Sequence, residues 1–243
     1  MIRVVAIIQA RMGSSRLPGK VMRDLAGEPM LARVVRRTSR AARIDHVVVA
    51  TTTDTSDDPV ARLCAEQGWG TFRGSRDDVL DRYYRAALAH DAGAIVRITS
   101  DCPLIDPPLV DRVIERFLRR PPVLDYCSNV YPERTYPRGL DTEVVSISAL
   151  ERSWMEDRNP ALREHVTQYI LRHPDLFSIG GIRHETDLSA HRWTVDTPED
   201  YSFVQQIYHH FGHDQFSWSE VLAYLEEHPE IVAINRDVRQ KVI

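Results

Sequence analysis

Short apolar runs alternate with helix-patterned segments along most of the chain, and this alternation limits the folds open to it. Continuous runs rich in β-branched or apolar residues stand at 3–9, 46–52 and 94–101, with a shorter one at 70–74. Segments of helical period lie between them, at 29–41, 57–68 and 77–93, and again from Pro107 onward. Apolar strands separated by helices are typical of a parallel sheet that helices cover on both faces. The sequence therefore predicts an α/β fold with a mostly parallel, doubly wound sheet.

The second half of the chain has a less regular pattern. LDYCSNV (124–130) and TEVVSIS (142–148) predict two further strands, and 149–173 is rich in helix-forming sequence. HRWTV (191–195) predicts a short strand, and Pro198 opens a helix with acidic residues in its first turn. Because no flexible linker or repeat divides the chain, we expect a single domain over 1–243. Within it we expect 123–182 to form a subdomain for acceptor binding or dimerisation.

Composition excludes several classes of protein. The chain has 243 residues, 43% of them hydrophobic, and a net charge of −4, which argues against a nucleic-acid partner. Its three cysteines have no metal-ligand spacing. The first predicted strand begins within two residues of the N-terminus, and no apolar run reaches the length of a membrane span. We therefore expect a cytoplasmic protein with neither a membrane nor a nucleic acid as partner.

The loop after the first apolar run, ARMGSSRLPGK (10–20), is cationic and poor in large apolar side chains. Gly13 and Gly19 allow close backbone approach, and Ser14 offers a hydroxyl and an amide. Arg11 can donate to two phosphate oxygens at once, whereas Lys20 is a mobile point charge. The spacing matches neither a P-loop nor a dinucleotide-binding loop. The loop indicates a small anionic ligand, and a solvated basic turn is the alternative.

This loop resembles the nucleotide loop of the sugar-nucleotide cytidylyltransferases, whose signature is an arginine followed by SxRLPGK. That family includes the 3-deoxy-manno-octulosonate and acylneuraminate enzymes, and its spore coat polysaccharide (SpsF-like) branch is the most similar. SDCPLID (100–106) is similar to the family's metal-binding D-x-P-L-I segment, and WTVDTPEDY (193–201) to its VDTPEDL segment. The resemblance covers most of the chain. It implies a three-layer αβα fold of the nucleotide-diphospho-sugar transferase type.

The resemblance also implies how a nucleotide is held and activated. The loop would embrace the triphosphate of CTP, and Arg11, Lys20 and Asp101 would be catalytic. Asp101 and Asp196, each at the end of a predicted strand, would hold one Mg²⁺, which takes carboxylate and phosphate oxygens. The alternative is that each aspartate only caps a turn or a helix. The predicted nucleotide-binding residues in the loop and after the 94–101 strand are Ala10, Arg11, Gly13, Ser14, Arg16, Lys20 and Ser100.

Two further segments resemble the family less closely. GSRDDV (74–79) stands where the family holds cytosine and ribose, so Arg73, Ser75 and Asp78 are candidates, with an N-capped helix as the alternative. The segment 137–148, which begins PRGLDTEVVS, has the position of the family's sugar-contacting segment. The candidate acceptor-binding residues there and in REHVTQYI (163–170) are Arg138, Asp141, Glu143, Arg163 and His165. The octulosonate enzymes carry a histidine and an aromatic pattern here that this chain lacks, so the sugar is not identified.

The predicted reaction is attack of an acceptor oxygen on the α-phosphate of CTP, releasing pyrophosphate and forming a CMP-sugar for surface polysaccharide biosynthesis. The expected acceptor is a small acidic sugar of the nonulosonate or 3-deoxy sugar acid type. A sugar phosphate, polyol phosphate or phosphonate acceptor is one alternative. A glycosyltransferase with a similar nucleotide-binding fold is another, and a non-enzymatic nucleotide sensor is a third. The family commonly forms dimers, so a homodimer is expected.

Overall fold

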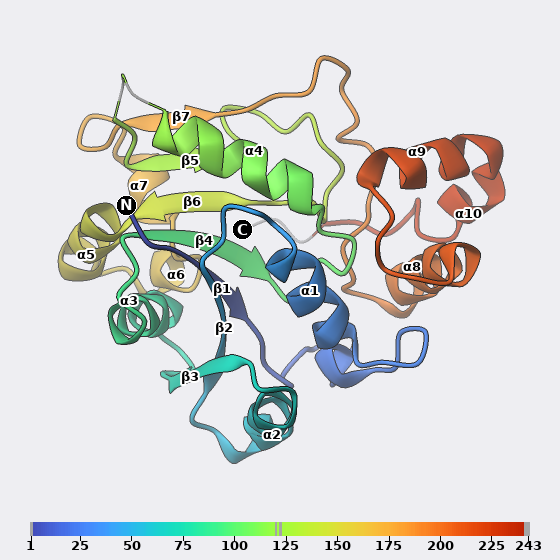
Figure 1. Cartoon of the computed structure of the whole chain (residues 1–243), viewed down its shortest axis with the longest axis horizontal. Helices are drawn as coiled ribbons and strands as arrows, with labels where there is room; N and C mark the ends of the chain where they lie inside the picture. The colour runs from blue at the N-terminus through green and yellow to red at the C-terminus, as the bar shows by residue number, and fades with distance from the viewer. Residues whose placement is uncertain (1, 120, 122, 241–243) are drawn as a thin grey trace.

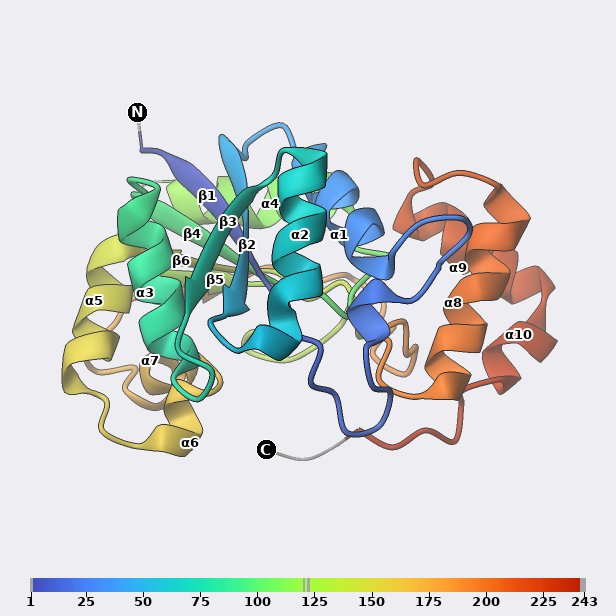
Figure 2. The ribbon, with the colours of Figure 1, turned by 90° about the horizontal axis from the view of Figure 1, so that it is seen from below.

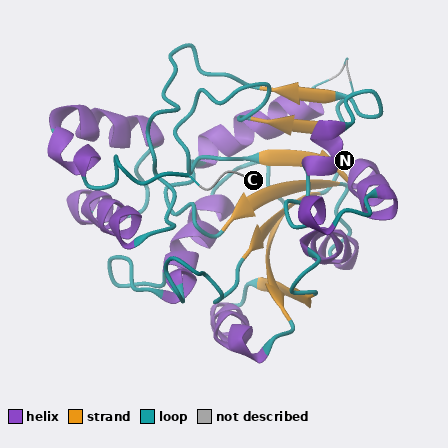
Figure 3. Ribbon diagram, turned by 180° about the vertical axis from the view of Figure 1, so that it is seen from behind, coloured by secondary structure: helices purple, strands orange, loops and turns teal. Residues whose placement is uncertain are grey.

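A seven-stranded sheet runs through the computed structural model, which describes residues 2–119, 121 and 123–240 (Figure 1). Its strand order is β3-β2-β1-β4-β6-β5-β7. The strands are β1 (Val4–Gln9), β2 (His46–Thr52), β3 (Gly70–Gly74), β4 (Ala94–Thr99), β5 (Tyr126–Ser128), β6 (Glu143–Ser146) and β7 (Ile179–Gly181). Only β6, among the described strands, is antiparallel to its neighbours, β4 and β5 (Figure 3). The predicted mostly parallel, doubly wound sheet is confirmed.

The central strand β1 decides where a ligand can bind. It pairs in parallel with β2 on one side and with β4 on the other, so the chain winds outward from β1 in two directions. In open α/β sheets the crevice at such a switch point, outside the carboxyl ends of the strands, is the usual ligand site. The loop at 10–20 leaves β1 at this edge and leads into the short helix η1 (Lys20–Met22).

Helices cover both faces of the sheet because side chains alternate along each strand. Ala6 and Ile8 of β1 belong to one core cluster, and Val5 and Ile7 to another. Figure 2 shows the two helical layers on either side of the strands. The first cluster contains residues from α1 (Met30–Ser39), α2 (Asp58–Gln67) and α4 (Pro107–Leu118). The second contains residues from α3 (Val79–Ala89), α5 (Ile147–Glu156) and α7 (Gln168–Arg172).

A third cluster lies beside α1, at the end of the molecule where the C-terminal helices gather (Figure 1). Trp193, Val195 and Leu17 are buried in it, so it anchors both the 10–20 loop and the extended segment at 191–196. The helices that contribute to it are α8 (Pro198–Phe211), α9 (Trp218–Glu227) and α10 (Pro229–Ala233). This cluster brings two distant parts of the sequence to the same edge of the sheet.

The second half of the chain differs from the sequence prediction in two places. The expected strand at 191–195 is wrong: this segment is extended but makes only a single bridge, between Arg138 and Arg192. Strand β7 was not predicted, because Gly180 and Gly181 interrupt any apolar pattern there. A Cβ on Gly181 would lie 1.9 Å from the carbonyl oxygen of Tyr131, so the close approach of the two backbones excludes a larger residue.

The helix-rich stretch at 149–173 divides into α5, a single turn α6 (Pro160–Arg163) and α7. The 123–182 segment supplies β5, β6 and β7 to the main sheet. The homodimer remains a prediction.

No helix in the described part of the chain is long and apolar enough to cross a bilayer.

We expect Arg37→Leu to destabilise the fold strongly. Arg37 is 1% exposed and donates to the carbonyls of Ile105 (2.7 Å), Asp214 (2.6 Å) and Phe216 (2.9 Å). Leucine would leave these carbonyls buried without their donor, at a cost of about 2–4 kcal/mol in the free energy of unfolding. Urea denaturation measures this cost.

The matched control for Arg37 is Arg43→Gln, which removes an exposed ion pair with Glu115 at 2.7 Å. Its effect should stay within about 0.5 kcal/mol, because exposed pairs contribute little. Equal effects of the two substitutions would contradict the structural role given to Arg37.

Candidate active site

Backbone hydrogen bonds hold the 10–20 loop in a defined shape. The amide of Gly19 donates to the carbonyl of Met12 at 3.0 Å, and the amide of Met12 donates to Asp57 Oδ1 at 2.6 Å. Gly19 has a φ of 66°, in the left-handed region that glycine enters without a Cβ penalty. The loop therefore folds back on itself and presents Lys20 to the carboxyl edge of the sheet.

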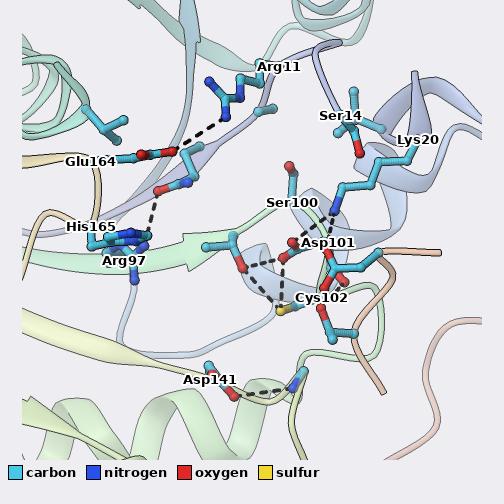
Figure 4. Close-up of a pocket in the computed structure, with 18 of the residues that line it drawn as sticks. Arg11, Ser14, Lys20, Arg97, Ser100, Asp101, Cys102, Asp141, Glu164 and His165 are labelled. Carbon is cyan, nitrogen blue, oxygen red and sulfur yellow. Dashed lines mark hydrogen bonds and ion pairs between the residues drawn. The ribbon is translucent and has the colours of Figure 1, made fainter. Parts of the chain in front are cut away.

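Lys20 is bound between two carboxylates. Its Nζ lies 3.1 Å from Asp101 Oδ2 and 3.0 Å from Asp196 Oδ1, and it also donates to the carbonyl of Val195 at 2.7 Å. Figure 4 shows the lysine reaching from its loop toward Asp101. Burial acts to lower the pKa of Lys20, but the two carboxylates outweigh it and raise the pKa above its ordinary value. Lys20 is therefore charged at neutral pH.

Asp101 lies two residues after the end of β4, where the chain turns away from the sheet. Its Oδ1 accepts a hydrogen bond from Thr99 Oγ1 at 2.5 Å. Burial acts to raise the pKa of Asp101, but Lys20 and the Thr99 hydroxyl hold it below its usual range. Asp101 is therefore an ionised carboxylate at neutral pH.

Asp196 reaches the same place from the far end of the sequence. The amide of Val195 donates to the carbonyl of Asp101 at 2.8 Å, and the amide of Trp193 donates to the carbonyl of Arg138 at 2.7 Å. The 191–196 segment thus lies between the end of β4 and the turn at 137–141. Thr197, and not Asp196, is the N-cap of α8, so the side chain of Asp196 is directed to other partners.

Arginines fix the orientation of Asp196. Its Oδ2 lies 3.1 Å from Arg16 Nη2 and 3.0 Å from Arg192 Nη2. Arg192 also pairs with Asp200, which is fully buried and accepts from the amide of Asp196 at 3.0 Å. Lys20, Arg16 and Arg192 together surround one carboxylate, so its position depends on a network that spans 10–20 and 192–200.

A cavity of about 550 Å³ opens in front of this cluster, at the carboxyl ends of β1 and β4. Of the predicted site residues, the cavity is lined by Ala10, Arg11, Gly13, Ser14, Arg16, Lys20, Ser100, Asp101, Arg138, Asp141, Glu143, His165 and Asp196. Arg11 Nη2 lies 3.9 Å from Glu164 Oε1, and Figure 4 shows these two side chains facing each other. The structure therefore brings the 10–20 loop, the two aspartates and the predicted acceptor-binding residues around a single space.

Both carboxylates predicted to bind the acceptor already have arginine partners. Asp141 forms a two-pronged pair with Arg134, with contacts at 2.5 and 2.6 Å. Glu143 pairs with Arg97, and its other oxygen accepts from Tyr126 and Thr167, each at 2.7 Å. These carboxylates hold arginines in place at the cavity wall, and neither is a free general base.

Arg138 differs from its neighbours at this wall. Burial, Arg134 and Arg192 lower the pKa of Arg138, only partly offset by Asp141 and Asp196. It lines the cavity as a cation whose surroundings favour the arrival of an anion.

Four predicted residues do not line this cavity in the described structure. Arg73 donates to the carbonyls of Thr52 and Asp54 and pairs with Asp58, which ties β3 to the end of β2. The other three are Ser75, Asp78 and Arg163.

Asp78 caps α3 by accepting from the amide of Asp81, and Ser75 accepts from the amide of Asp78. Arg163 pairs with Asp78 at 2.8 Å. The N-capped helix that was the alternative for this region is therefore present, with Asp78 as its cap.

Several side chains that line the cavity were not predicted from the sequence, among them Arg82, Arg97, Arg134, Gln168 and Gln240. Arg97 could have been identified from the sequence, because a charge inside an otherwise apolar strand must have a partner or a function. Arg134 and Gln240 could not, since each reaches the cavity only through the path of a loop or of the C-terminal segment.

The chain is similar to known proteins over most of its length. A family model described as cytidylyltransferase matches residues 5–231. The chain belongs to the cytidylyltransferase family. This cytidylyltransferase is 34% identical to the spore coat polysaccharide biosynthesis protein SpsF of Bacillus subtilis, over 93% of this chain and 95% of SpsF. The resemblance inferred from the sequence is thus confirmed, and the protein is a nucleotidyltransferase.

Solved structures agree. A cytidylyltransferase from Leptospira borgpetersenii serovar Hardjo-bovis superposes with a TM-score of 0.92 at 32% identity, over the whole of both chains. The structure of CMP:2-keto-3-deoxy-manno-octonic acid synthetase with CTP shares the fold, with a TM-score of 0.66 at 21% identity over 86% of this chain and 99% of that one.

We expect Gly139→Ala to distort the cytidylyltransferase site and to destabilise the protein by about 2 kcal/mol or more. Gly139 has a φ of 108°, and a Cβ there would lie 2.6 Å from the amide nitrogen of Thr194. The new methyl group would push away the segment that carries Asp196. Gly13→Ala is the control, since its Cβ would meet nothing within 4 Å. Thermal denaturation of both variants checks the prediction, and an unchanged melting temperature for Gly139→Ala would contradict it.

Proposed function

We propose that this cytidylyltransferase moves CMP from CTP to a hydroxyl group of a small acidic sugar and releases pyrophosphate. The observation that carries the proposal is the convergence of Asp101 and Asp196 on one cation, Lys20 Nζ, beside a loop of glycines, serines and arginines. Two carboxylates on one cation next to a phosphate-binding loop are the arrangement that metal-assisted nucleotidyl transfer needs.

The donor set suits Mg²⁺. The Lys20 ammonium already lies about equally far from both carboxylates, so a cation fits between Asp101 and Asp196. Among the described residues, no group of three or more Asp, Glu, His or Cys side chains could hold a metal. Two carboxylates with phosphate oxygens and waters are a usual magnesium site. Once bound, Mg²⁺ would offset charge on the α-phosphate and lower the pKa of the acceptor hydroxyl.

The chain's own residues would then position the reactants. Arg11, Arg16 and the amides of the 10–20 loop would bind the triphosphate. The acceptor oxygen would attack the α-phosphorus in line, forming a new P–O bond as the bond to pyrophosphate breaks and the hydroxyl proton passes to water. Lys20 would follow the departing pyrophosphate, because an ammonium on a flexible stem keeps its charge while it moves.

The acceptor-side arginines support an acidic acceptor. Arg138 lines the cavity next to Arg134, whose guanidinium Asp141 holds in place. A carboxylate of the sugar would find a cation here without displacing an existing pair. A phosphate or phosphonate acceptor would use the same cation, so the assay must include both kinds of acceptor.

The first test is pyrophosphate release from each of the four nucleoside triphosphates with Mg²⁺, against acidic sugars, sugar phosphates, polyol phosphates and phosphonates. We expect release from CTP with one acceptor class, and a loss of about 100-fold or more in kcat/KM for Asp101→Asn and Asp196→Asn. Asp91→Asn, at an 88% exposed side chain, is the control. Consumption of a CMP-sugar without pyrophosphate would instead indicate glycosyl transfer, and unchanged rates in both variants would remove the proposed metal site.

A second test uses the competition between Lys20 and the metal. A divalent cation at the same position requires the ammonium to leave, and the triphosphate offers it another partner. Lys20→Met should therefore bind Mn²⁺ without nucleotide about tenfold or more tightly than the wild type, although its turnover falls. Electron paramagnetic resonance of free Mn²⁺ measures this affinity. Arg3→Met, an exposed residue with the same change in charge, is the control, and equal Mn²⁺ affinities for all three proteins would contradict a shared cation position.

A further inference from the structure

Asp57 stands at the start of helix α2 but does not cap it. Aspartate is a preferred N-cap residue because its side chain accepts from the amide of the second or third helical residue. Asp78 and Asp106 make such a bond at the starts of α3 and α4. Asp57 has the N-cap position of α2 but makes none, and the second residue of that helix is Pro59, which has no amide hydrogen. The carboxylate of Asp57 therefore serves partners outside its own helix.

The partners of Asp57 are a strand end and the loop that follows β1. Its Oδ1 accepts from the amide of Met12 at 2.6 Å, and its Oδ2 accepts from the hydroxyl of Thr52, the last residue of β2. Figure 2 shows the start of α2 beside this loop. Asp57 is 3% exposed. A carboxylate buried in this way depends on its hydrogen bonds, because water does not replace them.

Met12 links Asp57 to the rest of the loop. Its amide donates to Asp57 and its carbonyl accepts from the amide of Gly19 at 3.0 Å, so both of its backbone polar groups are fixed. Arg11 directly precedes Met12, and Lys20 directly follows Gly19. Both of these cationic residues line the cavity. One buried carboxylate thus helps to place the cations at the two ends of the loop.

The loop has few other contacts near Met12 that would keep this shape. A Cβ on Gly13, the next residue, would meet nothing within 4 Å, so the backbone there is not held by packing. Without the bond to Asp57, the loop would divide its population among several shapes. The apparent affinity of a ligand falls in proportion to the fraction of molecules in the binding-competent shape. A ligand that uses the whole loop would lose the most affinity.

Resting on the proposed function, we infer that Asp57 is a positioning residue for the triphosphate: its carboxylate holds the Met12 amide and so keeps the 10–20 loop in the shape that binds CTP. It acts through the loop and touches neither the nucleotide nor the acceptor. Its hydrogen bonds to Met12 and Thr52, in place of a cap on α2, are the observation that carries the inference.

The test measures the binding of CTP, inorganic tripolyphosphate and CMP by isothermal titration calorimetry with Mg²⁺. We expect Asp57→Ala to bind CTP and tripolyphosphate about 10-fold or more weakly than the wild type, because a hydrogen bond to a charged group is lost. The affinity for CMP should change by less than about threefold, since CMP lacks the β- and γ-phosphates and depends less on the shape of the loop.

Two further variants separate the hydrogen bonds from the stability of the fold. The side-chain oxygen of asparagine still accepts from the Met12 amide, so Asp57→Asn should stay within about threefold of the wild type for CTP. Thr52→Val keeps the shape of its buried side chain but removes one of the two donors that orient Asp57. It should weaken CTP and tripolyphosphate by about three- to tenfold, and it tests the inference even if Asp57→Ala does not fold.

Asp58→Ala is the matched control. Asp58 is the next residue, begins the same helix and pairs with Arg73 at 2.7 Å through a 48% exposed side chain. This variant should bind all three ligands as the wild type does.

Two results for Asp57→Ala would overturn the inference. One is unchanged binding of CTP and tripolyphosphate. The other is an equal loss for CTP, tripolyphosphate and CMP with a lower melting temperature, which is the result of a merely structural role. A wild type that binds tripolyphosphate but not CTP would instead remove the proposed function, and the variants would still test Asp57 with tripolyphosphate. A wild type that binds neither ligand would overturn both.

Discussion

The ion pairs of Lys20 with Asp101 and Asp196 join three segments that are far apart in the sequence. One carboxylate follows the end of β4, and the other stands almost a hundred residues later, before α8. With Lys20 12% exposed, the cluster is largely shielded from solvent, so the charges interact more strongly than they would in water. The position of the loop after β1, and with it the shape of the cavity, depends on this pairing. The cluster also gives the site a cation before any ligand arrives.

The chain uses its two kinds of cationic side chain differently. Lys20 and Lys241 are its two lysines, and arginine supplies every other basic side chain apart from histidine. Around the cavity, arginines such as Arg97, Arg134 and Arg192 each fix a carboxylate with a rigid, planar group. Lysine stands at the position where the proposed chemistry needs a charge that moves. Preorganised walls with one mobile cation are consistent with transfer governed by positioning and charge neutralisation.

Much of the fold and part of the site followed from local sequence. The apolar runs that became β1 to β4 were long and regular enough to predict, and the cationic loop with Asp101 and Asp196 came from motifs read in order. The positions of the predicted base-contacting residues did not follow from the local sequence. Asp78 and Ser75 have the residue types of nucleotide contacts, but the same types also stabilise helix starts. Here Asp78 caps α3, and Ser75 accepts from the amide of Asp78. Arg82 looked like an ordinary helix residue, because its burial against the cavity depends on how α3 packs under β1 to β3.

The sequence by itself determined the class of fold, the cationic character of the first loop and the family, because these depend on periodicity and on contiguous motifs. Only the tertiary structure decided which charges face the cavity. Arg134 and Asp141 neutralise each other, Arg163 is bound to Asp78, and Arg82 keeps a buried donor without a partner. The physical reason is that the effect of a charge depends on its distance from other charges and from water. Those distances are set when segments remote in sequence pack at the same edge of the sheet.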